Sequence, residues 1–255
     1  NAPKAVKFTE KVRQYVDEKL RLQWSPEQIA GRIERDIGET ISHERIYQYL
    51  AEDRKAGGTL WQNLRRARKK RKKRYGSADN RGKIPNRVGI EKRPAVVDAK
   101  VRRGDWEGDT VIGENHQGGL VTLVERKSQY VLIEPVQHKS APEVTEAILR
   151  CATPLRAIFK TLTFDNGKEF SGHEAIAAAL GVSVYFARAY HSWERGLNEN
   201  TNGLIRQYFP KKMPLRDLSI EWVKQVQDLL NHRPRKTLGY LTPHEVLVEG
   251  KPIRV

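Results

Sequence analysis

Apolar positions repeat at helical spacing in three short segments at the start of the chain. The first segment carries its apolar stripe at Val12, Tyr15, Val16 and Leu20. Residues at this spacing share one helix face, so the three segments are predicted to pack their apolar faces together. Residues 1–53 are therefore predicted to form an all-α domain.

Capping residues place the ends of the second and third helices. Ser25 and Gln28 have the spacing of a capping box around Pro26, and Gly38 permits a left-handed turn at the far end of that helix. The third helix is predicted to begin at the capping residue Ser42 and to bury Ile46, Tyr47 and Leu50.

Two short helices joined by a glycine-containing turn are typical of a helix-turn-helix, whose second helix enters the DNA major groove. The residues predicted to bind DNA lie at the start of the third helix: Ser42, His43, Arg45 and Gln48. The alternative is a small helical bundle that serves only assembly.

From residue 104 the pattern changes to apolar, β-forming runs separated by short turns. Three successive runs predict an antiparallel meander at 107–114, 119–127 and 129–137. Helices are predicted to begin near residues 140 and 173, and further short strands at 161–167 and 182–187. With a helical segment from residue 195 onward, this order predicts an α/β fold in which helices cover a mixed sheet.

The positive charge is concentrated between these two parts. The chain has a net charge of +16, and residues 54–103, with 19 basic and 3 acidic residues, carry all of it. Such a stretch repels itself unless a polyanion neutralises it, and DNA phosphates provide strong, sequence-blind neutralisation. We therefore predict a connector that binds the DNA backbone, most densely through Arg65, Arg66, Arg68, Lys69, Lys70, Arg71, Lys72, Lys73 and Arg74. A disordered basic tail or a localisation-type signal is the alternative.

Composition excludes several classes of protein. The single cysteine, Cys151, excludes an intrachain disulfide framework and a cysteine-based zinc site, and it fits a reducing cytoplasm. No run approaches the roughly 18 consecutive apolar residues of a membrane span. The first residues lack an apolar signal core, so secretion is not predicted.

Three acidic residues occupy positions with candidate chemistry. Asp109 lies inside an apolar strand, Asp165 ends a later strand, and Glu199 lies at a helix start. If the first and fourth strands are neighbours and the helix crosses them, the carboxylates converge and need a cation. Hard divalent cations prefer such oxygen ligands, and two of them can promote phosphodiester chemistry. Taken singly, Asp165 is also explained by a turn and Glu199 by a helix cap.

Four motifs, in this order, resemble the insertion sequence thirty family of bacterial transposases, which have a D-D-E core like that of retroviral integrases. They are DWEGDTVIG at 105–113, TFDNGKEF at 163–170, SWERGLNENTNGLIRQYFPK at 192–211 and NHRPRKTLGYLTPHEV at 231–246. The 33 residues between Asp165 and Glu199 are similar to the family's spacing. The segment WSPEQIAGRI…ISHERIYQYL resembles the family's internal helix-turn-helix.

The resemblance implies an RNase H-like core over residues 104–255, with a mixed five-stranded sheet and a catalytic, metal-binding triad of Asp109, Asp165 and Glu199. Asp105 and Glu107 share a strand face with Asp109, so alternation alone cannot choose among them, but the family pattern selects Asp109. Two Mg²⁺ ions are the implied cofactors, and Mn²⁺ is an acceptable substitute.

Further DNA contacts are expected close to the triad. Asn202 and Arg206 share a helix face with Glu199, and an aromatic residue such as Trp193 can stack on an unpaired base. The alternatives are a surface ion pair for Arg206 and core packing for Trp193 and the neighbouring Tyr190.

The resemblance implies cleavage at the ends of an insertion sequence and joining of the 3′-hydroxyl ends to target DNA. The implied partners are double-stranded DNA, as terminal inverted repeats and as target, and further copies of the chain in a dimer or larger assembly. A cytoplasmic, nucleoid-associated protein is expected, with a further N-terminal DNA-binding region. The alternatives are a metal-dependent endonuclease without strand transfer and a non-catalytic DNA-binding regulator.

Overall fold

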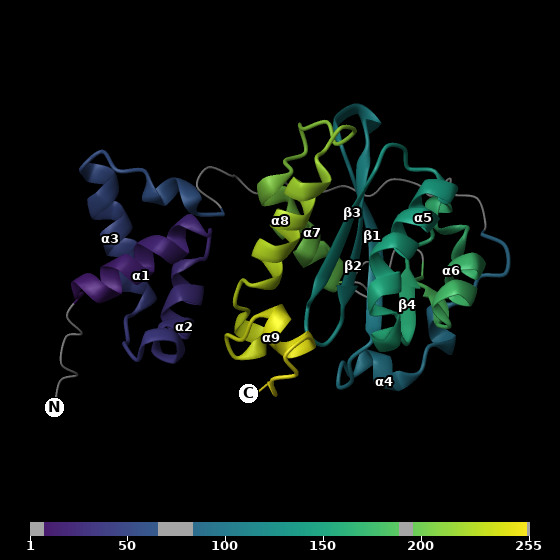
Figure 1. Cartoon of the computed structure of the whole chain (residues 1–255), viewed down its shortest axis with the longest axis horizontal. Helices are drawn as coiled ribbons and strands as arrows, with labels where there is room; N and C mark the ends of the chain where they lie inside the picture. Colours follow the sequence, from purple (N-terminus) through teal and green to yellow (C-terminus); the bar gives the residue numbers. More distant parts are fainter. Residues whose placement is uncertain (1–7, 66–83, 189–195, 254–255) are drawn as a thin grey trace. The chain divides into compact units, whose positions relative to one another are not determined.

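The computed structural model describes residues 8–65, 84–188 and 196–253. The chain divides into two compact units (Figure 1). One unit joins Asn1–Gly76 to His232–Val255, and the other comprises Ser77–Asn231. The functional division into DNA-binding domain, basic connector and catalytic core stays a prediction.

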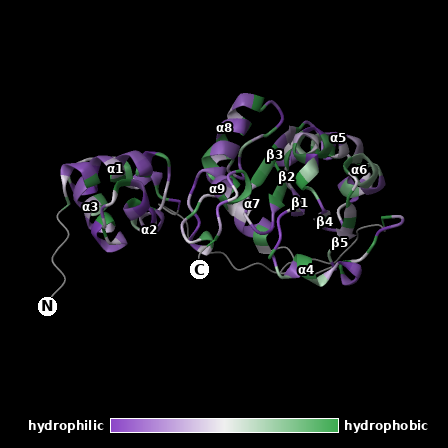
Figure 2. Ribbon diagram, turned by 60° about the horizontal axis from the view of Figure 1, so that its bottom comes forward, coloured by the Kyte–Doolittle hydropathy of each residue, from purple (hydrophilic) through white to green (hydrophobic). Residues whose placement is uncertain are grey.

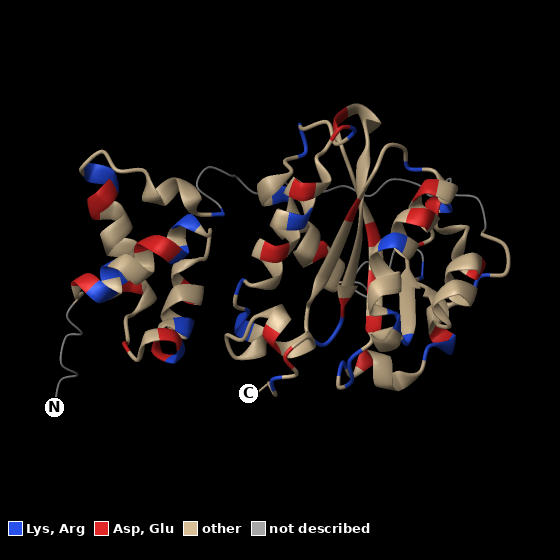
Figure 3. Ribbon diagram, in the orientation of Figure 1, with Lys and Arg blue, Asp and Glu red and all other residues tan. Residues whose placement is uncertain are grey.

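The first unit begins with the three predicted helices, α1 (Glu10–Arg21), α2 (Pro26–Ile37) and α3 (His43–Lys55). Both hydrogen bonds of the predicted capping box are present at the start of α2. Acidic and basic residues are mixed along these helices (Figure 3). Their inner faces form one apolar core, whose buried residues are Val12, Tyr15, Val16, Leu20, Trp24, Ile29, Ile33, Ile41, Ile46 and Leu50.

The prediction that Tyr47 is buried is wrong. Ile46 and Leu50 are buried, whereas Tyr47 is 49% exposed. Ile46 and Leu50 are four residues apart and lie on one stripe, but Tyr47 points about 100° away from Ile46 around the helix. Tyr49 packs against the core instead, and its hydroxyl donates to Asp17 Oδ1 over 2.9 Å.

The C-terminal segment, with the short helix α9 (Pro243–Leu247), packs on α2 within the same unit. Arg32 donates two hydrogen bonds to the Glu245 carboxylate, at 2.6 and 3.0 Å, and a third to the Tyr240 carbonyl at 3.1 Å. A Cβ atom on Gly31 would lie 2.4 Å from the Tyr240 ring, so this approach requires glycine. The sequence alone did not predict this association.

The second unit is built on a five-stranded sheet of order β3-β2-β1-β4-β5. β1, β2 and β3 are antiparallel, as the meander predicts, and β1, β4 and β5 are parallel neighbours. This architecture confirms the predicted mixed sheet. The strands are β1 (Asp105–Ile112), β2 (Gly119–Glu125), β3 (Val131–Val136), β4 (Thr161–Phe164) and β5 (Ser183–Phe186).

Helices cover both faces of this sheet (Figures 1 and 2). α5 (Ala141–Ala152) and α6 (His173–Leu180) cover one face, and α7 (Gly196–Tyr208) and α8 (Ile220–Asn231) cover the other. Apolar residues of α7 and α8 pack on those of β1, β2 and β3 in a single buried cluster. The short α4 (Ala95–Asp98) precedes β1. Among the described helices, none is long and apolar enough to cross a membrane.

Candidate active site

The register between β1 and β4 leads toward two of the three predicted catalytic residues. Asp105 lies opposite Thr161, and Glu107 lies opposite Thr163. Continuing this register by two residues places Asp109 opposite Asp165, which directly follows the last residue of β4. Neighbouring strands are about 4.8 Å apart, so the sheet brings the two backbones together.

The helix α7 is tied to β1 at the position of Asp109. Asn202 Nδ2 donates to Asp109 Oδ2 over 2.8 Å. The side-chain oxygen of Asn202 lies 3.5 Å from the hydroxyl of Thr122, which pairs with Asp109 across the β1–β2 ladder. Glu199 lies one turn earlier on the same face of α7 and is exposed.

The two competitors of Asp109 on the same strand face serve the fold. Asp105 is 1% exposed and accepts two hydrogen bonds of 2.9 Å from Arg102. The hydrogen bonds that Arg102 donates to Asp105 are the main cause that raises the pKa of Arg102. Glu107 is also 1% exposed and forms a buried ion pair with Arg126. Arginines therefore neutralise both carboxylates, and the choice of Asp109 still rests on the family pattern.

The turn after β4 fixes Asp165. The Gly167 N–H donates to Asp165 Oδ1 over 2.9 Å. A Cβ atom on Gly167 would lie 2.3 Å from a carboxylate oxygen of Glu169, so a side chain at this position would displace that carboxylate. Glu169 accepts a 3.1 Å hydrogen bond from the hydroxyl of Thr110, the residue after Asp109. The turn is thus tied to β1 beside the aligned aspartates.

Asn202 and Arg206, which were predicted to bind DNA, both contact β1. The Arg206 guanidinium donates to the Ile112 carbonyl over 2.7 Å, and burial lowers the pKa of Arg206. The predicted contacts of both residues with DNA are untested and stay predictions.

The predicted DNA-binding residues of α3 differ in their surroundings. Ser42, His43 and Gln48 are exposed. Arg45 is partly buried, pairs with Glu52 over 3.1 Å and lies over the Phe8 ring. Trp193, Tyr190 and residues 66–74 of the basic stretch lie outside the described residues.

The donors at this site have the chemistry that a divalent cation prefers. Carboxylate oxygens come from Asp109 and Asp165, and the Asn202 amide and Gly167 N–H orient them. Within residues 8–65, 84–188 and 196–253, no group of three or more His, Cys, Asp or Glu side chains is assembled in a form that could hold a metal ion. The triad therefore stays a prediction.

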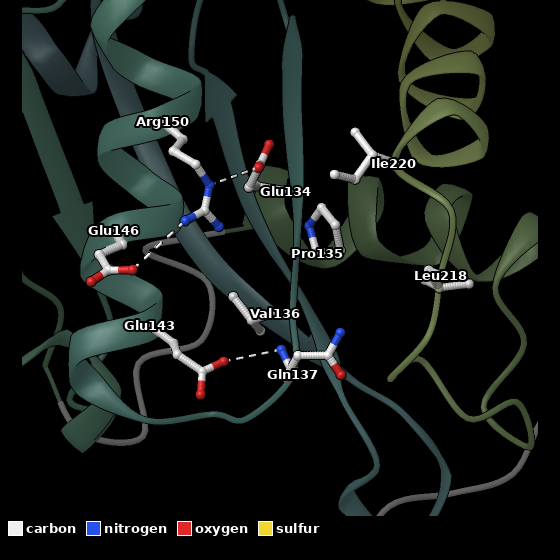
Figure 4. Close-up of a pocket in the computed structure, with 9 residues that line it drawn as sticks. All are labelled: Glu134, Pro135, Val136, Gln137, Glu143, Glu146, Arg150, Leu218 and Ile220. Carbon is white, nitrogen blue, oxygen red and sulfur yellow. Dashed lines mark hydrogen bonds and ion pairs between the residues drawn. The ribbon is translucent and has the colours of Figure 1, made fainter.

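A groove of about 400 Å³ lies elsewhere, along the edge strand β3 (Figure 4). Its acidic residues make internal contacts: Glu134 pairs with Arg150 and Lys224 at 3.1 Å, and Glu143 accepts the Gln137 N–H. β3 is separated from β1 by β2, so we assign the groove no part in the candidate active site.

Comparisons with known proteins agree with this architecture. A family model described as the integrase core domain matches residues 102–192. The transposase for insertion sequence element IS4351 from Bacteroides fragilis is 44% identical over 238 residues, which cover 93% of this chain and 73% of the relative. Transposase InsI for IS30A from Escherichia coli K12 is 40% identical over 252 residues, 94% of this chain and 65% of the relative. The chain belongs to the IS30 family of transposases.

A further relative is the transposase for insertion sequence element IS1086 from Cupriavidus metallidurans. It is 38% identical over 248 residues, 93% of this chain and 71% of the relative. The resemblance predicted from the sequence motifs is confirmed, and family membership assigns the chain to DNA transposition.

Proposed function

We propose that the transposase cleaves DNA at the ends of an insertion sequence and joins the 3′-hydroxyl ends to target DNA, with Asp109, Asp165 and Glu199 as its catalytic triad. Family membership supports the reaction class. The observation that supports the site is the β1–β4 register, which pairs Glu107 with Thr163 and, continued by two residues, leads to Asp109 and Asp165. The hydrogen bond from Asn202 to Asp109 supports the place of α7 and hence of Glu199.

The triad would hold divalent cations, Mg²⁺ or in its place Mn²⁺, which neutralise charge on the reacting phosphate and activate the attacking oxygen. The chain's own residues position the ligands. Asn202 holds the Asp109 carboxylate through Oδ2, and the Gly167 N–H holds that of Asp165 through Oδ1. Preorganised ligands need not reorient during the reaction, so the barrier falls.

Two displacements at phosphorus account for cleavage and joining. Water attacks the phosphodiester at the element end, a P–O bond to water forms, and the 3′-oxygen leaves with a proton as a 3′-hydroxyl. This hydroxyl attacks a target phosphodiester in line, and the target's own 3′-oxygen leaves. Each step exchanges one P–O bond for another, so positioning and charge stabilisation are the main demands on the protein.

DNA recognition is assigned to the helical unit and the basic stretch. The exposed residues at the start of α3 would contact base edges, and residues 65–74 would neutralise phosphates. Joining two element ends to one target requires two active sites, so we include a dimer or larger assembly in the proposal.

The test uses pre-cleaved element ends, a target plasmid and Mg²⁺. Wild-type protein is expected to form joined product, whereas Asp165→Asn should abolish joining and keep DNA binding within a few-fold. Asp217→Asn, a change at an exposed aspartate outside the site, is the matched control and should join normally. Nicking without joining would indicate the endonuclease alternative. Metal-independent binding with no nicking would indicate the regulator.

A further inference from the structure

The turn that carries Asp165 also holds two basic side chains from other parts of the core unit. Asn166 Oδ1 accepts a hydrogen bond from the Arg87 guanidinium. Glu169 Oε1 forms an ion pair with Lys139 Nζ over 2.6 Å. Arg87 is exposed and the Lys139 side chain is 37% exposed, so both cations are accessible to a ligand.

The backbone around Arg87 is fixed by the sheet and by α6. Phe186, the last residue of β5, donates its N–H to the Val88 carbonyl over 2.9 Å. The Asn86 side chain donates to Glu174 of α6 over 3.1 Å. Arg87 is therefore an exposed side chain on a segment held from both sides.

The loop around Lys139 is fixed in a similar way. Glu143 accepts the backbone N–H groups of Gln137 and His138, at 3.0 and 2.9 Å. The His138 N–H is the largest cause that lowers the pKa of Glu143, so this carboxylate stays charged and keeps the loop in place. The ammonium group of Lys139 has three N–H donors, and its contact with Glu169 leaves capacity for a second acceptor.

We propose that Arg87 and Lys139 bind phosphates of the DNA strand that lies over Asp165, an inference that rests on the proposed function. A buried lysine would be enough to neutralise the carboxylate of Glu169. The exposure of Lys139 and the second cation on the same turn, Arg87, therefore need another explanation. Guanidinium and ammonium groups are the usual phosphate partners, one through a planar fork and one as a point charge. Because both are held in place before DNA arrives, little conformational entropy is lost on binding.

The test compares the double variant Arg87→Gln/Lys139→Gln with wild type in binding assays over a series of salt concentrations, without divalent metal. The probes are a duplex with an element end and an unrelated duplex. We expect affinity to fall by at least about 5-fold on one or both, and the slope of log affinity against log salt to flatten by about 1.8 for two phosphates. A loss on the element-end duplex alone assigns the phosphates to the element, and a loss on both assigns them to target-like DNA as well.

The matched control is Arg156→Gln/Lys160→Gln, which removes the same amount of charge from two exposed residues. These residues precede β4, whereas Asp165 follows it, so they lie at the opposite end of the strand from Asp165. Its binding should stay within two-fold of wild type. Unchanged affinity and slope in the double variant, or an equal loss in the control, would overturn the proposal. Arg87→Gln alone, expected to give half the slope change, carries the test if the double variant unfolds. This assay measures DNA binding without catalysis. A negative result would therefore overturn the phosphate contacts of Arg87 and Lys139 but not the proposed function, which the joining assay with Asp165→Asn tests separately.

Discussion

Asn202 on α7 donates its side-chain amide to the carboxylate of Asp109 on β1, at 2.8 Å. This hydrogen bond joins the helix that carries Glu199 to the strand that carries the first predicted catalytic residue. It also gives Asn202 a function that the sequence did not predict. The residue was expected to contact DNA, and in the structure its amide orients a candidate metal ligand.

Replacing Asn202 with alanine should slow strand transfer by about 10-fold and raise the Mg²⁺ concentration needed for half-maximal rate, because Asp109 loses its orienting donor. The rate is measured as a function of Mg²⁺ at saturating DNA. Gln225→Ala, at an exposed position of α8, is the control and should match wild type. An unchanged Mg²⁺ dependence in Asn202→Ala would show that the hydrogen bond does not act on the metal ligand.

Replacing Arg126 with methionine should lower the free energy of unfolding of the core unit by about 3–5 kcal/mol, because the buried Glu107 carboxylate would lose the arginine that neutralises it. The measurement is urea denaturation. The double variant Glu107→Gln/Arg126→Met should recover a large part of this loss, since it removes the charge itself. If the single and double variants are equally unstable, the ion pair is not the cause.

Replacing Gly31 with alanine should release the C-terminal segment from α2, because the new Cβ would overlap the Tyr240 ring. We expect faster proteolysis of residues 232–253, with α1–α3 still folded. Gly196→Ala is the control, since a Cβ there meets no atom of the described residues within 4 Å. The double variant Gly31→Ala/Tyr240→Ala lacks the Tyr240 ring, so the overlap with the new Cβ should be absent. Wild-type protection in Gly31→Ala would contradict the packing.

Acid should weaken the helical unit through Glu245. Burial opposes its charged form, but hydrogen bonds from Arg32 and Lys251 outweigh burial and hold the pKa of Glu245 well below its usual range. A carboxylate whose pKa is lowered in the folded state stabilises the fold fully at pH values above its unfolded pKa, which is about 4.5 for Glu245. This stabilisation of the fold is lost progressively as the pH falls below that value. The difference in urea midpoint between wild type and Glu245→Gln should therefore be largest near pH 7 and shrink below about pH 4.5. A difference that stays constant down to pH 3 would exclude this pair as the source.

Much of the fold followed from local patterns in the sequence. The caps at Ser25 and Ser42 are set by neighbouring residues, and so is the alternation along the first strands. Tyr47 was misplaced because an aromatic side chain was counted as apolar although it lies off the stripe defined by Ile46 and Leu50. Helical spacing, applied strictly, identifies it as exposed.

The contacts that complete the site join residues far apart in the chain, and no local pattern encodes them. The hydrogen bond between Asn202 and Asp109 and the tie between Lys139 and Glu169 are of this kind. The choice of Asp109 over Asp105 and Glu107 needed the family pattern, since all three share one strand face. In the structure, arginines neutralise Asp105 and Glu107.

The most direct test of the central proposal is Mn²⁺ binding, followed by electron paramagnetic resonance, in the presence of an element-end duplex. Asp109→Asn, Asp165→Asn and Glu199→Gln should each weaken Mn²⁺ binding by at least about 10-fold, while Glu146→Gln, at an exposed carboxylate, should not. Mn²⁺ binding at wild-type strength in any of the three triad variants would contradict a shared metal site.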